Sequence, residues 1–220
     1  MTPMYSIPLA RLGRLLASGL ALVALAACSV LSPTATPPPA FFSLDDARAA
    51  PPAAPPAAPA TAPTLVISPP RAAAGFDSQR IIYLREPYKL EYFANSEWVE
   101  PPARMLGPLL VNALERSAAF RAVMQTPASA GGDLRLDTHV IRLQQEFNTQ
   151  PSHVRFTLRA YLVDDKTRRV LAWREFDTDV AATSDDPYGG VVAANKAVQT
   201  VLVDLAAFCA QAARGVPPVK

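Results

Sequence analysis

The sequence is poor in the residues from which metal sites are built. Its 220 residues include two cysteines and two histidines. His139 and His153 fall at polar positions of predicted strands, and no carboxylate pair or third ligand stands at a recognisable spacing from them. A protein zinc site needs at least three such ligands. We therefore expect both histidines to be solvent-facing strand residues and the protein to hold no metal.

Catalytic motifs are missing as well. The sequence has no Gly-x-Ser-x-Gly nucleophile elbow, and Gly131-Gly132 and Gly189-Gly190 lack the Lys-Ser/Thr pair of a phosphate-binding loop. Asp164-Asp165 and Asp185-Asp186 stand at a predicted turn and a predicted helix cap, which are ordinary positions for aspartate. We expect no catalytic residues and no cofactor, and therefore a protein that is not an enzyme.

An excess of basic charge is also absent. The chain has 21 Lys and Arg against 19 Asp and Glu. Arg11 and Arg14 belong to a leader described below, and their removal leaves 19 basic and 19 acidic residues. Binding to nucleic acid phosphates needs a surplus of basic side chains. The sequence therefore predicts no nucleic acid partner.

The first 27 residues have the three parts of a secretion signal. Arg11 and Arg14 form the basic start, and residues 15–27 form an apolar run too short to span a bilayer, which takes about 20 residues. The run ends in Leu25-Ala26-Ala27-Cys28, which resembles the lipobox of bacterial lipoproteins. This resemblance implies diacylglyceryl transfer to the Cys28 sulfur, cleavage before Cys28, and acylation of the new amino group, as with palmitate. The alternative is an ordinary signal peptide with an incidental cysteine.

A multiply acylated Cys28 predicts firm attachment to a membrane, because two or more acyl chains anchor a protein stably. By resemblance to Gram-negative lipoproteins, in which Asp after the cysteine favours the inner membrane, Ser29 points to the outer membrane. The expected location is the periplasm-facing side of the outer membrane, with the inner membrane left open. Cys209 then has no intramolecular disulfide partner. It is predicted to be a buried apolar helix residue, with an intermolecular disulfide as the alternative.

Proline and alanine dominate the segment after the anchor. Residues 28–40 are predicted to be a tether, because such stretches act as semi-rigid spacers. Residues 41–213 are predicted to form one domain, interrupted by a flexible Ala/Pro-rich insertion at 47–63 and followed by a tail at 214–220. Phe41-Phe42-Ser43-Leu44 is expected to be a short strand that joins this domain. The alternative is a disordered apolar segment that binds a partner.

Hydrophobic periodicity predicts an α+β fold with a mostly antiparallel sheet and two main helices packed on one face. Residues 80–85 and 89–93 are expected to form a hairpin, and residues 64–68 a further strand. Three long strands are predicted to form an antiparallel meander, at 134–147 with a bulge near Val140, 153–162 and 170–180. The helices are expected to begin at Pro101-Pro102 and to cover 188–213.

Aromatic residues gather just before the first predicted helix. Tyr92, Phe93 and Trp98 are possible partner contacts, since Tyr and Trp are enriched at interfaces. The alternative is core packing, in which Trp98 fixes the chain where it enters the helix.

Several segments resemble the PqiC-like auxiliary lipoproteins of ABC-type transport systems, over roughly residues 41–210. The most specific is the Trp-x-x-Pro-Pro pattern at Trp98, within residues 90–106. The others are residues 41–44, 74–83, 133–137, 169–176 and 192–197. The Ala/Pro-rich stretch at 47–63 departs from the family pattern.

This resemblance implies an accessory role in an MCE system, in which an inner-membrane ATPase and permease work with an MCE-domain protein to move lipids or other hydrophobic molecules. The implied role is an outer-membrane docking piece that contacts the MCE-domain protein and the ABC permease, either as a single chain or as a homo-oligomer. The alternatives are a stand-alone periplasmic lipid carrier and an envelope-structure lipoprotein.

Overall fold

The computed structural model describes residues 38–45, 58–127 and 131–215. The predicted signal, Cys28 and most of the tether, the insertion and the tail lie outside the described residues. The chain divides into two units, residues 1–38 and 39–220. All the helices and strands of the described ranges lie in the second unit.

One sheet of nine strands runs through the described ranges. Its strands are β1 (Ala40–Phe42), β2 (Thr64–Ile67), β3 (Arg71–Ala72), β4 (Arg80–Leu84), β5 (Glu91–Trp98), β6 (Ala122–Gln125), β7 (Leu134–Glu146), β8 (His153–Asp164) and β9 (Val170–Ala181).

The long strand β7 organises the sheet. On one side β7 pairs with β8, and β8 pairs with β9, all antiparallel, so the predicted meander is confirmed. The register of β7 against β8 shifts between Val140 and Arg142, which confirms the predicted bulge. On its other side β7 pairs in succession with β2, β3 and β4.

These last three pairings correct the prediction of a mostly antiparallel sheet. β2, β3 and β4 all run parallel to β7, β6 runs parallel to β2, and β1 runs parallel to β5. The sheet is therefore mixed. β2, β3 and β4 follow one another in the sequence without reversing direction, so each meets a different part of β7 with the same polarity.

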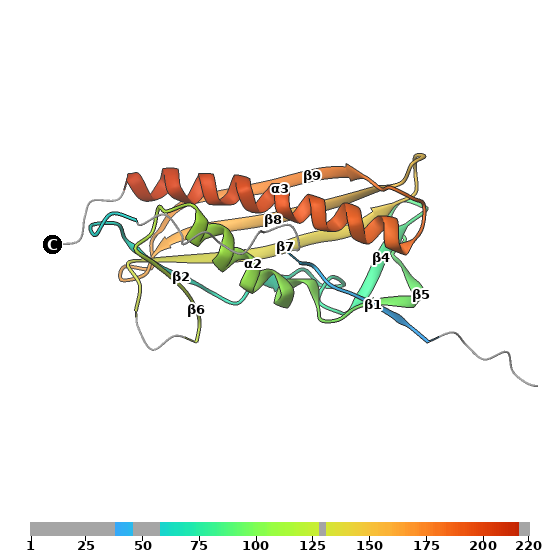
Figure 1. Cartoon of the computed structure of the whole chain (residues 1–220), viewed down its shortest axis with the longest axis horizontal. Coiled ribbons are helices and arrows are strands. Elements are labelled where there is room, and N and C mark those ends of the chain that lie inside the picture. Colours follow the sequence, from blue (N-terminus) through green and yellow to red (C-terminus); the bar gives the residue numbers. More distant parts are fainter. Residues whose placement is uncertain (1–37, 46–57, 128–130, 216–220) are drawn as a thin grey trace, which may run out of the picture. The chain divides into compact units, whose positions relative to one another are not determined.

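Two helices lie on one face of the sheet (Figure 1). Helix α2 (Pro102–Arg116) begins with proline in its first turn, as predicted. Helix α3 (Pro187–Arg214) begins at Asp186, whose side chain accepts a hydrogen bond from the Gly189 amide at 2.7 Å. The core between helices and sheet includes the fully buried side chains Leu65, Ile67, Leu106, Leu110, Leu114, Leu134, Leu136, Phe156, Leu158, Leu162 and Leu205.

Helix α3 is long and apolar enough to cross a membrane by length and composition, and half of its most apolar window is buried inside the fold. Its apolar stripe packs against β8 and β9. The apolar character of α3 is therefore explained by its place in the core.

The segment at Phe41–Leu44 joins the domain, as expected. β1 pairs with β5, with Phe42 opposite Trp98, and the Leu44 side chain is buried. Asn195 of α3 holds the chain beyond β1: its Oδ1 accepts from the Asp45 amide at 2.8 Å, and its Nδ2 donates to the Ser43 carbonyl at 3.1 Å.

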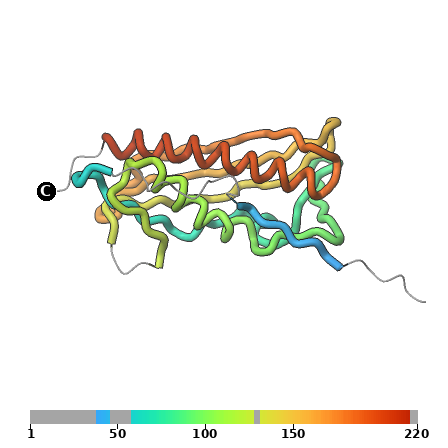
Figure 2. The backbone as a smooth tube through the Cα atoms, in the orientation of Figure 1, coloured from blue at the N-terminus to red at the C-terminus, as the bar shows by residue number. Residues whose placement is uncertain are grey.

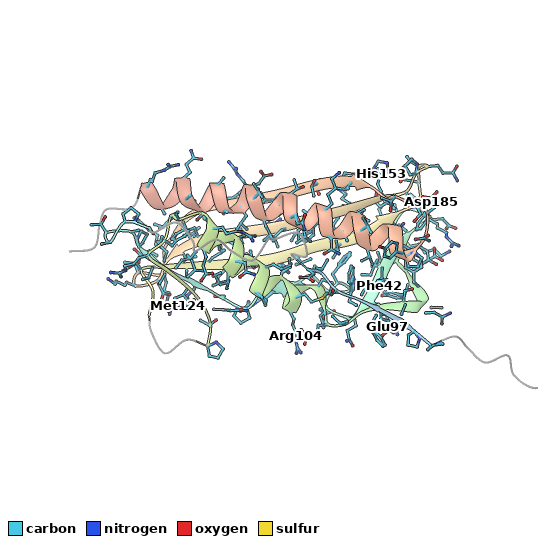
Figure 3. All side chains as sticks on the ribbon, viewed as in Figure 1. Phe42, Glu97, Arg104, Met124, His153 and Asp185 are labelled. Carbon is cyan, nitrogen blue, oxygen red and sulfur yellow. The ribbon has the colours of Figure 1, made fainter. Side chains whose placement is uncertain are left out.

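The domain has two ends, which the strand directions define (Figure 2). At the proximal end β7 finishes, α3 begins, and the β4–β5 turn (residues 85–90) projects. β1 runs opposite to β7, so the chain that precedes β1 leaves towards this end. At the distal end β7 begins and the β8–β9 turn lies. Figure 3 shows Phe42, Glu97 and Asp185 towards the proximal end and Met124 towards the distal end.

Candidate docking surface

The face of β7, β8 and β9 that points away from the helices is a polar surface, which we call the outer face. No helix in the described ranges covers it. Strand alternation places apolar side chains such as Leu136, Leu158 and Phe176 towards the helices and polar ones on this face. Its cross-strand rows are Asp137–Tyr161–Trp173, His139–Arg159–Glu175, Arg142–Thr157–Asp177 and Gln144–Arg155–Asp179.

Neighbouring charges on the outer face neutralise one another. Arg159 Nη2 lies 2.7 Å from Glu175 Oε2, and Arg155 Nη2 lies 2.7 Å from Asp177 Oδ2. The Arg155 side chain holds the pKa of the Asp177 carboxyl below its usual value, mainly by hydrogen bonding. Such exposed pairs contribute little to folding, typically about 0–1 kcal/mol each. They do fix the side chains in place, which presents an ordered pattern of donors and acceptors.

One large aromatic interrupts this charged surface near the distal end. The Trp173 side chain is 61% exposed and stacks on Tyr161, with ring centroids 6.3 Å apart and planes 28° apart. Tryptophan and tyrosine carry much of the energy of protein interfaces, and an exposed tryptophan costs solvation free energy in the isolated protein. The pair is therefore suited to binding a partner.

A small cavity lies beside the α3 N-terminus, lined by residues that include Ile82, Trp98, Gln145 and Gly190. Its volume of about 10 Å³ is near the least that holds one water molecule. This cavity is far too small for an acyl chain, so it does not support the alternative of a stand-alone lipid carrier.

The comparison with known families decides which class of protein this is. Residues 42–206 match the family described as ABC-type transport auxiliary lipoprotein component. The chain belongs to this family. The resemblance found in the sequence is thereby confirmed, and it gives this auxiliary lipoprotein a cell-envelope location and an accessory part in a transport system.

Solved structures show the same fold. Protein XCC0632 from Xanthomonas campestris is 24% identical, with a TM-score of 0.65, and the match covers 80% of the auxiliary lipoprotein and 94% of that chain. An uncharacterized protein is 13% identical, with a TM-score of 0.61, over 78% and 99% of the two chains. No curated protein matches the auxiliary lipoprotein.

The aromatic residues singled out in the sequence do not form one surface. Trp98 is 3% exposed and belongs to the core cluster, so its side chain is not available to a partner on this domain. Phe93 is partly buried and packs beside Tyr83, with ring centroids 4.5 Å apart. Tyr92 remains exposed, with the Arg80 guanidinium 4.8 Å above its ring. The core-packing alternative thus describes Trp98, and a partner contact stays a prediction for Tyr92.

The two histidines lie on the sheet surface, and Cys209 lies in the core. His139 and His153 both lie on the outer face, each partly exposed, and His153 Nδ1 contacts Asp179 Oδ1. In the described part of the chain, no three His, Cys, Asp or Glu side chains lie together in a way that could hold a metal ion. Cys209 is fully buried, as predicted, and burial raises the pKa of its thiol to about 12. A thiol in that state reacts poorly.

Sequence reasoning overlooked the Trp173–Tyr161 pair. A signal was present: the alternation of β8 and β9 puts both aromatics in the polar phase, among Arg155, Arg159 and Glu175. An aromatic residue in the polar phase of a half-buried strand indicates a surface that binds another molecule.

Proposed function

We propose that this auxiliary lipoprotein is a non-enzymatic docking component of an MCE-type ABC transport system, anchored through lipid on Cys28 in the outer membrane. Its partners are the MCE-domain protein and, through it, the ABC permease and ATPase. It assists the movement of lipid or another hydrophobic substrate by holding the machine at the membrane.

The exposed Trp173–Tyr161 pair on the outer face carries this proposal. A surface of paired charges around one exposed tryptophan has the composition of a transient protein interface, with a polar rim and an aromatic anchor. The pair lies at the distal end, opposite the direction in which the chain leaves β1. In the proposed arrangement, the anchored domain presents Trp173 away from its own membrane.

A homo-oligomer is part of the proposal. Within the described ranges β9 pairs only with β8, so its other edge offers unpaired backbone groups along 12 residues. A second copy or the partner would add a strand there. Charged residues on β9 limit unspecific pairing of this edge.

The test is capture of partners from detergent-solubilised envelopes by the lipidated protein, with identification by mass spectrometry. The wild-type chain and a Val203→Ala control, altered on the exposed side of α3, should recover an MCE-domain protein and an ABC permease. Trp173→Ala should reduce the amount of recovered partner protein at least about tenfold, since an interface anchor contributes roughly 2 kcal/mol or more to binding. Equal recovery by Trp173→Ala would contradict docking through the outer face, and recovery of lipid without protein would favour a carrier.

A further inference from the structure

The β4–β5 turn at the proximal end has an unusual residue at its tip. The Lys89 amide donates to the Glu86 carbonyl at 3.3 Å, which closes a β-turn with Pro87 and Tyr88 at its centre. Tyr88 has φ = 67°, a left-handed conformation that glycine or asparagine adopts at lower cost. The fold thus keeps an aromatic residue at a strained position, and strain of this kind often marks a functional segment.

This turn directs apolar side chains into solvent. The Tyr88 ring is fully exposed, and Leu90 and Tyr92 are each 39% exposed. Phe41 in β1 and Tyr188 at the start of α3 are also exposed, and both belong to elements that begin at the proximal end. Apart from Trp173 near the distal end, the exposed large aromatic side chains of the described ranges therefore lie towards the proximal end.

The charges of the turn are balanced. Lys89 Nζ lies 3.6 Å from Glu86 Oε1 and 3.9 Å from Glu91 Oε1, and the Arg85 guanidinium lies 5.1 Å from the Tyr83 ring centroid. Tyrosine and leucine flanked by long basic side chains are the residues that settle at the boundary between lipid headgroups and acyl chains. Together with Glu91 at the start of β5, the turn carries two acidic and two basic residues, so its attraction to a membrane would not depend on anionic lipid.

The length and direction of the chain before β1 allow the membrane to meet the proximal end of the domain. Eleven residues, 29–39, separate the predicted lipid-bearing cysteine from the start of β1, and they span at most about 40 Å when fully extended. Helix α3, at 28 residues, is about as long. The chain leaves β1 towards the proximal end, and the β4–β5 turn lies at this same end of the domain.

We propose that the β4–β5 turn, with Tyr88 and Leu90 as the inserting side chains, dips into the headgroup region of the membrane that holds the lipid anchor. The contact is weak by itself. It becomes occupied because a short tether gives the turn a high effective concentration at the bilayer. The domain is thereby held upright, with the outer face presented away from the lipid. The inference rests on the anchor at Cys28 and not on the identity of the docking partner.

The experiment uses the lipidated protein, with lipid on Cys28 verified by mass spectrometry, in phosphatidylcholine vesicles. Tyr88→Cys carries an environment-sensitive fluorophore, and Val203→Cys on α3 carries the same label as a control. The native Cys209 is buried, with a raised thiol pKa, and escapes labelling. We expect doxyl-labelled lipids to quench most of the emission from position 88, at a depth of roughly 5–10 Å, and to leave position 203 unchanged.

Two further measurements separate this contact from its alternatives. Adding phosphatidylglycerol to the vesicles should leave the quenching unchanged, since aromatic insertion and not net charge drives the contact. Leu90→Ser in the Tyr88→Cys chain should reduce the quenching without lowering the thermal transition. Equal signals at positions 88 and 203 would overturn the proposal. Shielding of position 88 that appears only after envelope proteins are added would overturn it too, and would assign the turn to a protein partner.

Discussion

At the scale of single residues, several side chains hold elements together that are distant in sequence. Asp133 is one: its Oδ2 accepts from the Thr64 amide at 3.0 Å and from the Thr64 hydroxyl at 2.9 Å, and so joins β2 to the start of β7. The hydrogen bond that the Thr64 backbone N–H donates is the main reason that the pKa of the Asp133 carboxyl lies below its ordinary value.

This lowered pKa predicts acid sensitivity. A carboxyl whose folded pKa is depressed stabilises the fold above its unfolded pKa, near 3.9, and that stability is lost as pH falls through the folded pKa. Asp133→Asn should cost about 1 kcal/mol of unfolding free energy at pH 7 and should flatten the decline below pH 4. Urea unfolding at pH 7 and pH 3 measures both effects. An unchanged decline in the variant would show that other carboxyls, such as Asp165 and Asp177, dominate.

Gly190 is a second residue at which close packing disfavours a larger side chain. It lies in the first turn of α3, where an added Cβ would meet Gln145 Oε1 at 2.1 Å, and Gln145 is buried and hydrogen-bonded to Ser152 at 2.8 Å. Gly190→Ala should therefore destabilise the domain by about 1–3 kcal/mol through overpacking. Gly131→Ala is the matched control, because its added Cβ would meet nothing within 4 Å. Thermal unfolding of the two variants gives the comparison, and equal transition temperatures would contradict this close packing.

At the scale of elements, the connection between β1 and α3 decides how firmly the chain that leads to the membrane is attached. Asn195→Ala removes the hydrogen bonds to Ser43 and Asp45 and should cost about 1–2 kcal/mol. Amide exchange at Asp45 should speed up selectively, while exchange in the β7–β9 meander stays slow. Uniformly faster exchange across the domain would mean that Asn195 supports the whole fold and not this attachment.

The elements also show what a sequence reveals and what it hides. Long periodic patterns identified β7, β8, β9 and both helices, and the proline pair at Pro101 marked the start of α2. β3 and β6 have two and four residues, too few to give a periodic pattern. The parallel pairings of β7 were missed because strand partners depend on contacts across the fold, while alternation reports only which face a residue occupies.

The same limit applied to the candidate surface. Aromatic residues near the first helix drew attention because they cluster in the sequence, yet Trp98 is in the core. Tyr161 and Trp173 are separated in the sequence and come together only across the β8–β9 register. Their meeting is a product of strand pairing, so the sequence showed each aromatic in the polar phase but not the pair.

At the scale of the whole molecule, the proposed function combines a lipid anchor on Cys28 with a docking surface near the distal end of the domain. It predicts that Cys28→Ala yields a folded, unanchored domain that no longer supports transport. Fractionation, circular dichroism and an in vivo complementation assay check the three parts of this statement. Full complementation by the unanchored Cys28→Ala chain would show that transport does not require the lipid anchor.

The central claim is that the outer face binds the transport machine, and photo-crosslinking in intact cells tests it most directly. A photoreactive phenylalanine analogue replaces Trp173 in one strain and Val203, exposed on the opposite, helical side, in another. We expect a crosslink from position 173 to an MCE-domain protein, and none from position 203. Crosslinking from position 203 but not from position 173 would contradict docking through the outer face.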